Sequence, residues 1–462
     1  MIATTLAAIA EMTGGRLGAG CDPAREVTGP VVTDSRNVEP GSLFVALPGE
    51  RTDGHDFAAA AVADGAVAVL AAREVDAPCV VVDDPAFALG RLARSVIDRL
   101  GTTVVAVTGS SGKTTTKDML ASVLGRLGPV VAPQGSFNNE IGHPVTALRC
   151  DESTRVLVSE MGARSEGHIA YLCEITPPDV SVVLNVGSAH LGEFGSREAI
   201  GRAKSEIVRA LSPDGTAVLN ADDPIVAGMA EVTAGRVVLV GESPSADVRA
   251  EDVRIEPSGQ ARFTLAAGDD RADVALRLVG EHQVANALSS AGVALTLGMD
   301  LAGIASALCE VEPASRWRME VTERPDGTVV INDAYNANPE SVRAALKALV
   351  SMAGGRRSWA VLGEMRELGE AAAAEHDGIG RLAVRLNVDR LVAVGEGARA
   401  IHLGAAHEGS WGNESVWVPD IDAVLAMLGD ELAPGDVVLV KGSRLVGLEA
   451  VAAALTDEET SA

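Results

Sequence analysis

Short runs of valine, isoleucine, leucine and alanine recur along the chain and alternate with longer alanine-rich stretches. The runs TTVVAVTG, VLVSEM and VSVVLNVG are almost continuously apolar, as expected of strands buried on both faces of a parallel sheet. Helix-like segments between such runs are typical of βαβ units. Residues 245–279 instead alternate polar and apolar positions, which predicts antiparallel strands. The pattern therefore predicts an α/β protein whose central sheet is mainly parallel.

The chain has 462 residues, which at roughly 100–200 residues per domain suggests about three domains. Residues 1–100 indicate a small N-terminal α/β domain. Residues 101–312 indicate a central domain that begins at TTVVAVTG and ends after the helical stretch VANALSSAGVALTLG. Residues 313–462 alternate helices with the strands TVVINDAY, SWAVLGEM, RLVAVG and DVVLVKGS. This last pattern predicts a smaller, Rossmann-like C-terminal domain.

Composition narrows the class of partner. Asp and Glu total 64 against 38 Lys and Arg, a net charge of -26 that repels nucleic acid and acidic membranes. The five cysteines are scattered and form no CxxC, which fits neither a disulfide framework nor a zinc site. The N-terminus lacks a basic region, and no apolar run approaches the roughly 20 residues of a spanning helix. We expect a soluble, cytoplasmic protein, a monomer without stable membrane insertion.

The strongest local signal is the segment TGSSGKTTTKDML, which follows an apolar run and opens a helix. Such a turn points backbone amides at phosphate oxygens, Lys113 can reach the β- and γ-phosphates, and the Thr114 hydroxyl can bind Mg²⁺. The general pattern GxxxxGK[ST] would place a glycine where Val107 stands. The alternative is a plain turn with a solvated lysine. The residues expected at the phosphates are Gly109, Ser110, Ser111, Gly112, Lys113, Thr114 and Thr115.

Further candidates follow other predicted strands and helices. Glu160 and His190 come at the ends of VLVSEM and VSVVLNVG, so both are expected at the carboxyl edge of one sheet, where they could hold Mg²⁺. Taken alone, His190 is better interpreted as a hydrogen-bonded loop histidine, and the spacing of Lys204 favours an ordinary surface lysine. Asn286, at a helix start, could read the adenine edge or could cap the helix. The third block adds residues that could clamp a nucleotide or an anionic substrate: Arg318, Asp333, Asn336, Lys441 and Arg444.

Together these motifs resemble the Mur ligases of bacterial cell-wall synthesis. The segments that carry the resemblance span nearly the whole chain: TDSRNVEPGSLFVALPGERTDGHDF, TGSSGKTTTKDML, NNEIGHPVTAL, SEMGA, NVGSAHLGEFGS, AKSEI, NDAYNANPES, VLGEMRELGEAAAAEHDGIG and VLVKGSR. Within the family, DAYNANP and LGEMRELG favour the member that adds D-alanyl-D-alanine. The DNPR-like motif usual in the ligase that adds diaminopimelate or lysine is absent from the sequence.

The resemblance implies an ATP-dependent ligase that joins D-alanyl-D-alanine to UDP-N-acetylmuramoyl-tripeptide (UDP-MurNAc-tripeptide) through an acyl phosphate in peptidoglycan synthesis. It implies two Mg²⁺ ions, held by Thr114, Glu160 and His190, and a carbamate on Lys204 that supports the second ion. By the same resemblance Asn286 reads adenine, although Gln283 stands where the family usually has Asn. Arg318 would lie near the phosphates and Asp333 at the ribose. Lys113, Lys204 and His190 are the expected catalytic residues.

The N-terminal domain is expected to bind the UDP-sugar. The residues that the resemblance assigns to the UDP-sugar, the tripeptide or the dipeptide are Ser35, Arg36, Asn138, Asn139, Asn336, Lys441, Ser443 and Arg444. The motifs disfavour two alternatives. One is a related ligase that adds a single amino acid, or glutamate to a folate; the other is a phosphate-loop scaffold or switch without ligase activity. The sequence does not decide whether the third peptide residue is diaminopimelate or lysine.

Overall fold

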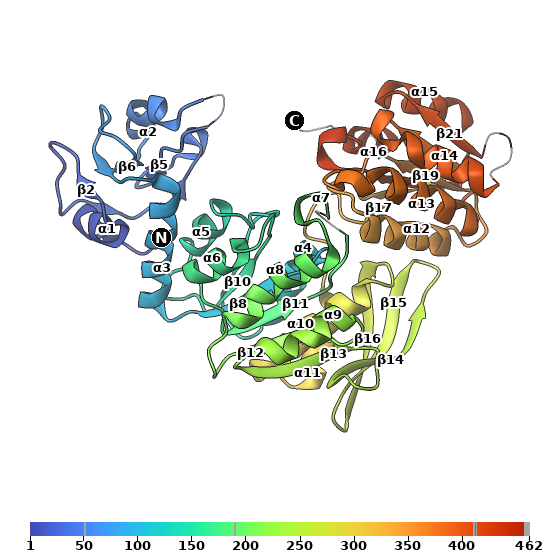
Figure 1. Cartoon of the computed structure of the whole chain (residues 1–462), viewed down its shortest axis with the longest axis horizontal. Coiled ribbons are helices and arrows are strands. Elements are labelled where there is room, and N and C mark those ends of the chain that lie inside the picture. Colours follow the sequence, from blue (N-terminus) through green and yellow to red (C-terminus); the bar gives the residue numbers. More distant parts are fainter. Residues whose placement is uncertain (50–51, 189–190, 410–411, 413, 457–462) are drawn as a thin grey trace.

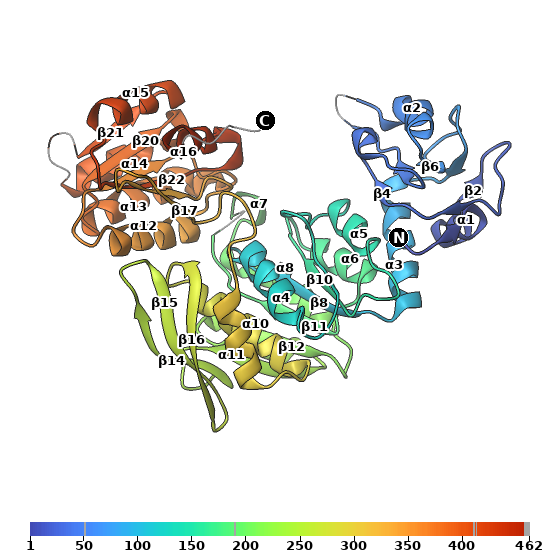
Figure 2. The same ribbon diagram turned by 180° about the vertical axis from the view of Figure 1, so that it is seen from behind.

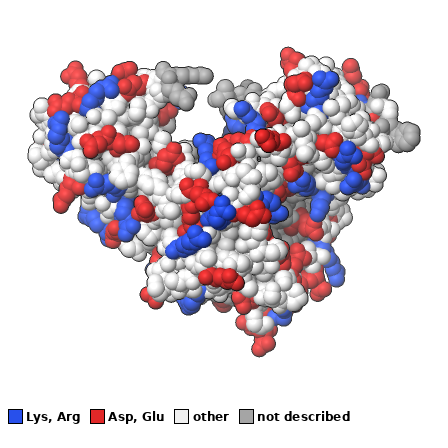
Figure 3. Space-filling view, in the orientation of Figure 1, with Lys and Arg blue, Asp and Glu red and all other residues white. Residues whose placement is uncertain are grey.

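The computed structural model of the chain describes residues 1–49, 52–188, 191–409, 412 and 414–456. Three lobes follow one another along the sequence (Figure 1), and the view from behind shows the same arrangement (Figure 2). The first and last lobes lie above opposite ends of the central one, and the space-filling view shows a notch between them (Figure 3). On this face acidic and basic side chains are interspersed (Figure 3). No helix among the described residues is long and apolar enough to cross a membrane.

The N-terminal lobe contains a five-stranded sheet in the order β2-β7-β6-β5-β4. Its strands are β2 (Arg16–Leu17), β4 (Val31–Val32), β5 (Leu43–Val45), β6 (Ala68–Ala71) and β7 (Cys79–Val81), with a separate pair, β1 (Thr4–Thr5) and β3 (Glu26–Val27). Its helices are α1 (Leu6–Thr13), α2 (Ala58–Ala63) and α3 (Pro85–Leu100). Helix α3 begins at Pro85 after an Asp84 cap and packs on both α1 and the central lobe. One hydrophobic core therefore runs across the boundary near residue 100.

The central lobe is built on nine strands in the order β16-β15-β14-β13-β12-β11-β8-β10-β9. They are β8 (Thr103–Thr108), β9 (Val130–Val131), β10 (Val156–Glu160), β11 (Val180–Val183), β12 (Thr216–Asn220), β13 (Arg236–Gly241), β14 (Val248–Ile255), β15 (Gln260–Ala267) and β16 (Asp270–Val279). The sheet is parallel from β9 to β14, and β15 pairs antiparallel with both of its neighbours, β14 and β16. The prediction of antiparallel strands near residues 245–279 is confirmed.

Helices cover both faces of the central sheet. They are α4 (Lys113–Leu124), α5 (Gly142–Ala147), α6 (His168–Ile175), α7 (Leu191–Phe194), α8 (Arg197–Arg209), α9 (Pro224–Ala227), α10 (Gln283–Thr296) and α11 (Leu301–Glu310). In β8, Val105 and Val107 pack into the core under α4 and α10, while Val104 and Ala106 pack into the opposite core. This explains the unbroken apolar run of that strand, since both of its faces are buried.

The C-terminal lobe has six strands in the order β17-β18-β22-β19-β20-β21. They are β17 (Glu320–Glu323), β18 (Val329–Asn332), β19 (Ser358–Leu362), β20 (Arg390–Val394), β21 (Ser415–Val418) and β22 (Val437–Lys441), all parallel except β17. The helices are α12 (Pro339–Ala353), α13 (Ala372–Arg385), α14 (Arg399–Glu408), α15 (Ile421–Glu431) and α16 (Glu449–Thr456). The predicted three-domain α/β fold is confirmed, while β17 and β21 were not predicted.

Candidate functional site

The turn between β8 and α4 is the predicted phosphate loop. Gly112 has a φ of 81°, and a Cβ there would lie 2.6 Å from Asn286 Oδ1, so glycine is required both by the backbone and by this close approach. Lys113 begins α4, and its Nζ donates a hydrogen bond to the Gly109 carbonyl at 2.7 Å. Burial lowers the pKa of Lys113, and the neighbouring Glu160 carboxylate opposes that shift. A phosphate here would stabilise the charged form of this lysine.

Asn185, just after β11, is hydrogen-bonded to the predicted phosphate loop. Its Oδ1 accepts hydrogen bonds from the amides of Ser110 and Ser111, both at 3.0 Å. The Ser110 hydroxyl in turn accepts a hydrogen bond from the Gly187 amide at 2.9 Å. Because the first amides of a helix have no partner within it, the start of α4 keeps donors for an anion. Sequence reasoning missed Asn185, although its place in NVG at a strand end was a usable signal.

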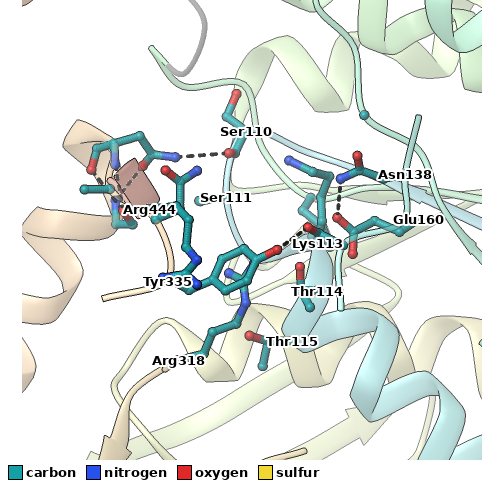
Figure 4. Close-up of a pocket in the computed structure, with 18 of the residues that line it drawn as sticks. Ser110, Ser111, Lys113, Thr114, Thr115, Asn138, Glu160, Arg318, Tyr335 and Arg444 are labelled. Atoms are coloured by element: carbon teal, nitrogen blue, oxygen red, sulfur yellow. Dashed lines mark hydrogen bonds between the residues drawn. The ribbon is translucent and has the colours of Figure 1, made fainter. Parts of the chain in front are cut away.

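Glu160 ends β10 and is almost completely buried beside the loop. Its Oε1 accepts a hydrogen bond from Asn138 Nδ2 at 2.7 Å. Its Oε2 is buried and has no hydrogen-bond partner among the described residues. A buried carboxylate oxygen without a partner is costly unless a ligand satisfies it. Lys113, Thr114, Asn138 and Glu160 lie together on one side of the site (Figure 4).

The resemblance assigns His190 and Lys204 to a second metal ion. His190 lies outside the described residues. Lys204, on α8, is buried rather than at the surface, with 6% of its area exposed. Burial, and secondarily the charge of Lys113, lowers the pKa of Lys204 well below its ordinary value. This lysine does not line the main cavity, and its expected role stays a prediction.

The start of α10 contributes an amide pair near the phosphate loop. Asn286 Nδ2 donates to Gln283 Oε1 at 2.8 Å, and both side chains are buried against the main cavity. The neighbouring His282, which is partly buried, also lines the cavity, and desolvation lowers its pKa to about 4, which keeps it neutral. The two amides and the neutral ring offer donors and acceptors of the kind that an adenine edge requires.

Cations and aromatic rings of the C-terminal lobe face the phosphate loop across the cavity. The Arg318 guanidinium lies 4.3 Å from the centre of the Tyr335 ring. Lys441 is buried, and its Nζ donates to Asp333 Oδ2 at 2.6 Å and to the Asn336 carbonyl at 2.8 Å. Burial lowers the pKa of Lys441. The nearby Asp333 carboxylate opposes that shift. Arg318, Tyr335 and Arg444 lie opposite Glu160 and Asn138 in the close-up (Figure 4).

The central and C-terminal lobes are joined by direct hydrogen bonds at the site. Asn338 Nδ2 donates to the Ser110 carbonyl of the phosphate loop at 3.2 Å. Glu340 Oε1 accepts from the Ser188 amide at 2.8 Å and from its hydroxyl at 2.9 Å. Both side chains belong to the start of α12, where Asn338 forms a capping box and Pro339 occupies the first turn. The predicted motif NDAYNANPES thus supplies contacts between lobes as well as cavity residues.

One cavity of about 1110 Å³ brings these groups together. The structure places there most of the residues that the sequence singled out: Ser110, Ser111, Gly112, Lys113, Thr114, Thr115, Asn138, Asn139, Glu160, Asn286, Arg318, Asp333, Asn336, Lys441, Ser443 and Arg444. From the N-terminal lobe it includes Thr33. Ser35 and Arg36 lie in the short turn Ser35–Asn37 outside this lining, where the exposed Arg36 pairs with Asp34 at 2.6 Å. Their assignment to the UDP-sugar stays a prediction.

Known proteins match this chain in sequence along nearly its whole length. Family models match in three parts: the Mur ligase family catalytic domain over residues 30–95, the Mur ligase middle domain over 107–294 and the Mur ligase glutamate ligase domain over 317–444. A UDP-N-acetylmuramoyl-tripeptide--D-alanyl-D-alanine ligase of Mycobacterium bovis is 52% identical over an alignment that covers 100% of this chain and 99% of the relative. The chain belongs to the Mur ligase family.

Solved structures of this family superpose on the whole fold. MurF from Acinetobacter baumannii matches with a TM-score of 0.90 at 34% identity, covering 99% of this chain and 100% of that one. MurF from Thermotoga maritima, solved in complex with ADP, matches with a TM-score of 0.81 at 32% identity, covering 94% and 98%. The resemblance inferred from the motifs is therefore confirmed, and the three-lobe architecture is that of the Mur ligases.

Proposed function

We propose that this chain joins D-alanyl-D-alanine to UDP-MurNAc-tripeptide at the expense of ATP, forming the UDP-linked pentapeptide used in peptidoglycan synthesis. The observation that carries the proposal is the single cavity in which the phosphate loop, Glu160 and cations of the C-terminal lobe face one another. The names of the full-length relatives and the ADP complex of the Thermotoga enzyme support both the substrates and the nucleotide.

The reaction has two steps. The terminal carboxylate of the tripeptide attacks the γ-phosphorus of ATP, forming an acyl phosphate and releasing ADP. The dipeptide amine then attacks the acyl carbon, loses a proton and displaces inorganic phosphate. The first step brings two anions together, so it needs fixed positive charge in a site with little water. Lys113 from the loop and Arg318 from the opposite wall supply that charge.

The residues beside the loop fit a Mg²⁺ ion. Glu160 presents a buried oxygen without a partner, and the buried Thr114 lies in the first turn of α4. The described residues hold no group of three His, Cys, Asp or Glu that could bind a metal by themselves. This agrees with Mg²⁺, which keeps waters and takes phosphate oxygens. Thr114 and Glu160 would hold the ion, and it would neutralise charge on the phosphates.

We further propose that Lys204 carries a carbamate. Carbon dioxide reacts with the neutral form of an amine, and burial beside Lys113 favours that form of Lys204. The nitrogen bonds to the carbon of carbon dioxide and one proton is released to water, so the product is a carbamate anion that is attracted to the Lys113 ammonium. With His190, the carbamate would support a second Mg²⁺ as the resemblance implies.

The test is a reconstituted reaction with the purified full-length chain. Phosphate release should require ATP, Mg²⁺, UDP-MurNAc-tripeptide and D-alanyl-D-alanine together, and mass spectrometry should find the pentapeptide product. Release with a single amino acid in place of the dipeptide would favour a related ligase, and release without either peptide would favour a scaffold or switch. Assays with diaminopimelate- and lysine-containing tripeptides would decide the third residue.

We infer a monomer that works in the cytoplasm, where ATP is supplied.

A further inference from the structure

Trp317 lies in the linker between the central and C-terminal lobes and touches a cation of the cavity. The Arg444 guanidinium stands 4.4 Å from the centre of the Trp317 ring, within the range of a cation–π interaction. One nitrogen of the same guanidinium pairs with Glu449. Since Arg444 lines the cavity, its remaining donors can meet a substrate. The indole face and Glu449 together fix the plane of this guanidinium.

The backbone of Trp317 is strained and held. Its φ is 59°, in the left-handed region that a bulky residue rarely adopts. Its amide donates to Glu320 Oε2 at 3.1 Å, and its carbonyl accepts from the Tyr335 amide at 3.2 Å. Met319 repeats the pattern with a φ of 50° and an amide that donates to Asp333 Oδ1 at 3.1 Å. Such strain persists only where the surroundings determine it, and it gathers at functional sites.

The two strained residues flank Arg318, so this short segment orients one guanidinium by its backbone and a second by its ring. Arg318 turns to the Tyr335 ring, and Arg444 is held on the Trp317 ring. Both arginines line the cavity, on the wall opposite Glu160 (Figure 4). Without the indole, the long Arg444 side chain would keep its contact with Glu449 but lose the ring that fixes its plane, and it would sample other rotamers.

We propose that Trp317 is a positioning residue that holds Arg444 ready to bind the carboxylate of the dipeptide substrate. The inference rests on the proposed function. Lys113 and Arg318 already serve the phosphates and the tripeptide carboxylate, and Arg444 lies in the C-terminal lobe on the same wall as Arg318. We assign to Arg444 the free carboxylate of D-alanyl-D-alanine. An arginine with a fixed plane can bind that carboxylate through two parallel hydrogen bonds.

The experiment compares Trp317→Gly, Trp317→Phe and Trp417→Phe in steady-state ligation by the full-length chain. Trp417 is the control, because its ring also faces an arginine, Arg399, at 5.3 Å but does not line the cavity. Trp317→Gly should raise the KM for D-alanyl-D-alanine roughly 2- to 30-fold, the loss that corresponds to one cation–π contact. The KM for ATP should stay within about twofold, since the contact does not involve the nucleotide. Trp317→Phe should restore part of the affinity, and Trp417→Phe should behave as wild type.

A double-mutant cycle tests whether Trp317 acts through Arg444. The double variant Trp317→Gly/Arg444→Met should bind the dipeptide no more weakly than Arg444→Met alone. Arg444→Met already removes the guanidinium that Trp317→Gly would leave misplaced. Glycine also relieves the positive φ, so the melting temperature of Trp317→Gly should not fall.

Two results overturn the proposal. One is an unchanged dipeptide KM in Trp317→Gly, and the other is a parallel rise of all three KM values with a lower melting temperature, which indicates a structural role. Failure of the wild-type chain to use D-alanyl-D-alanine at all would instead refute the proposed function, and it would be seen before any variant is made.

Discussion

The hydrogen bonds from Ser188 to Glu340 join the central lobe to the C-terminal lobe. Substituting Glu340 therefore tests how strongly these two lobes are held together. Glu340 is the second residue of α12, so its carboxylate lies at the positive end of that helix. A Cβ on Gly187 would lie 2.4 Å from the Glu340 carboxyl carbon, so the approach is possible only because that residue is glycine. We expect Glu340→Ala to loosen the C-terminal lobe from the nucleotide-binding lobe.

The magnitude follows from the two hydrogen bonds that Glu340 Oε1 accepts. A hydrogen bond to a charged group contributes roughly 1.5–3 kcal/mol when shielded from water. The Glu340 side chain is 31% exposed, so screening reduces the pair to about 2 kcal/mol in total. That is roughly a thirtyfold change in the equilibrium between joined and separated lobes. Where joining limits the reaction, kcat/KM falls by up to that factor; Glu340→Gln, which keeps an acceptor oxygen, should lose less.

The assay pairs ligation kinetics with small-angle scattering in the presence of ATP and the UDP-tripeptide. Glu375→Ala is the matched control: Glu375 pairs with Arg343 at 2.6 Å inside the C-terminal lobe and has a similar exposure, 24%. Glu340→Ala should show a larger radius of gyration and slower ligation than Glu375→Ala. If the two variants ligate and compact alike, the contact contributes nothing to joining the lobes, and the reasoning is refuted.

Three more predictions concern single side chains. Lys113→Ala should lower the ligation rate roughly 100- to 1000-fold, as loss of one preorganised charge does, with an unchanged melting temperature; near-normal phosphate release would contradict the phosphate-loop assignment. Lys204→Ala should lose activity that added acetate or formate partly restores, whereas full activity without rescue would make Lys204 a structural lysine. Burial lowers the pKa of His143 to about 4, against about 6.5 in the unfolded chain, so stability is lost as pH falls from 6.5 towards 4. Denaturant unfolding should show a loss of about 2 kcal/mol from His143 between pH 8 and 5, which His143→Gln should abolish.

Local pattern predicted the parts of the site that lie within one element. The apolar run of β8 and the turn after it predicted the phosphate loop, because a strand buried on both faces leaves a plain signature. Strand β17 was missed because EVTE is short and polar, as an antiparallel edge strand can be. Strand β21, SVWV, is an equally short edge strand beside β20.

Contacts between distant segments could not be predicted from pattern alone. Asn338 and Ser110 are 228 positions apart, and nothing local to either one indicates the other. The carboxamide of Asn185 was missed for the same reason, since it acts on amides 74 and 75 positions earlier in the chain. Lys204 shows the opposite case. Its spacing favoured a surface lysine, and only the resemblance to a family indicated that it is special; the structure finds it buried.

The predicted phosphate loop is contacted by both the central and the C-terminal lobe. We therefore expect nucleotide binding to depend on the position of the C-terminal lobe. Asn185 of the central lobe holds two of its amides, while Asn338 of the C-terminal lobe holds the Ser110 carbonyl. We therefore expect a nucleotide that shifts the loop to alter this contact between the lobes, and movement of the C-terminal lobe to alter the loop. Acyl phosphates hydrolyse readily, so a site that is complete only when the lobes meet protects the intermediate from water. The Asn338 contact places that requirement at the predicted phosphate loop.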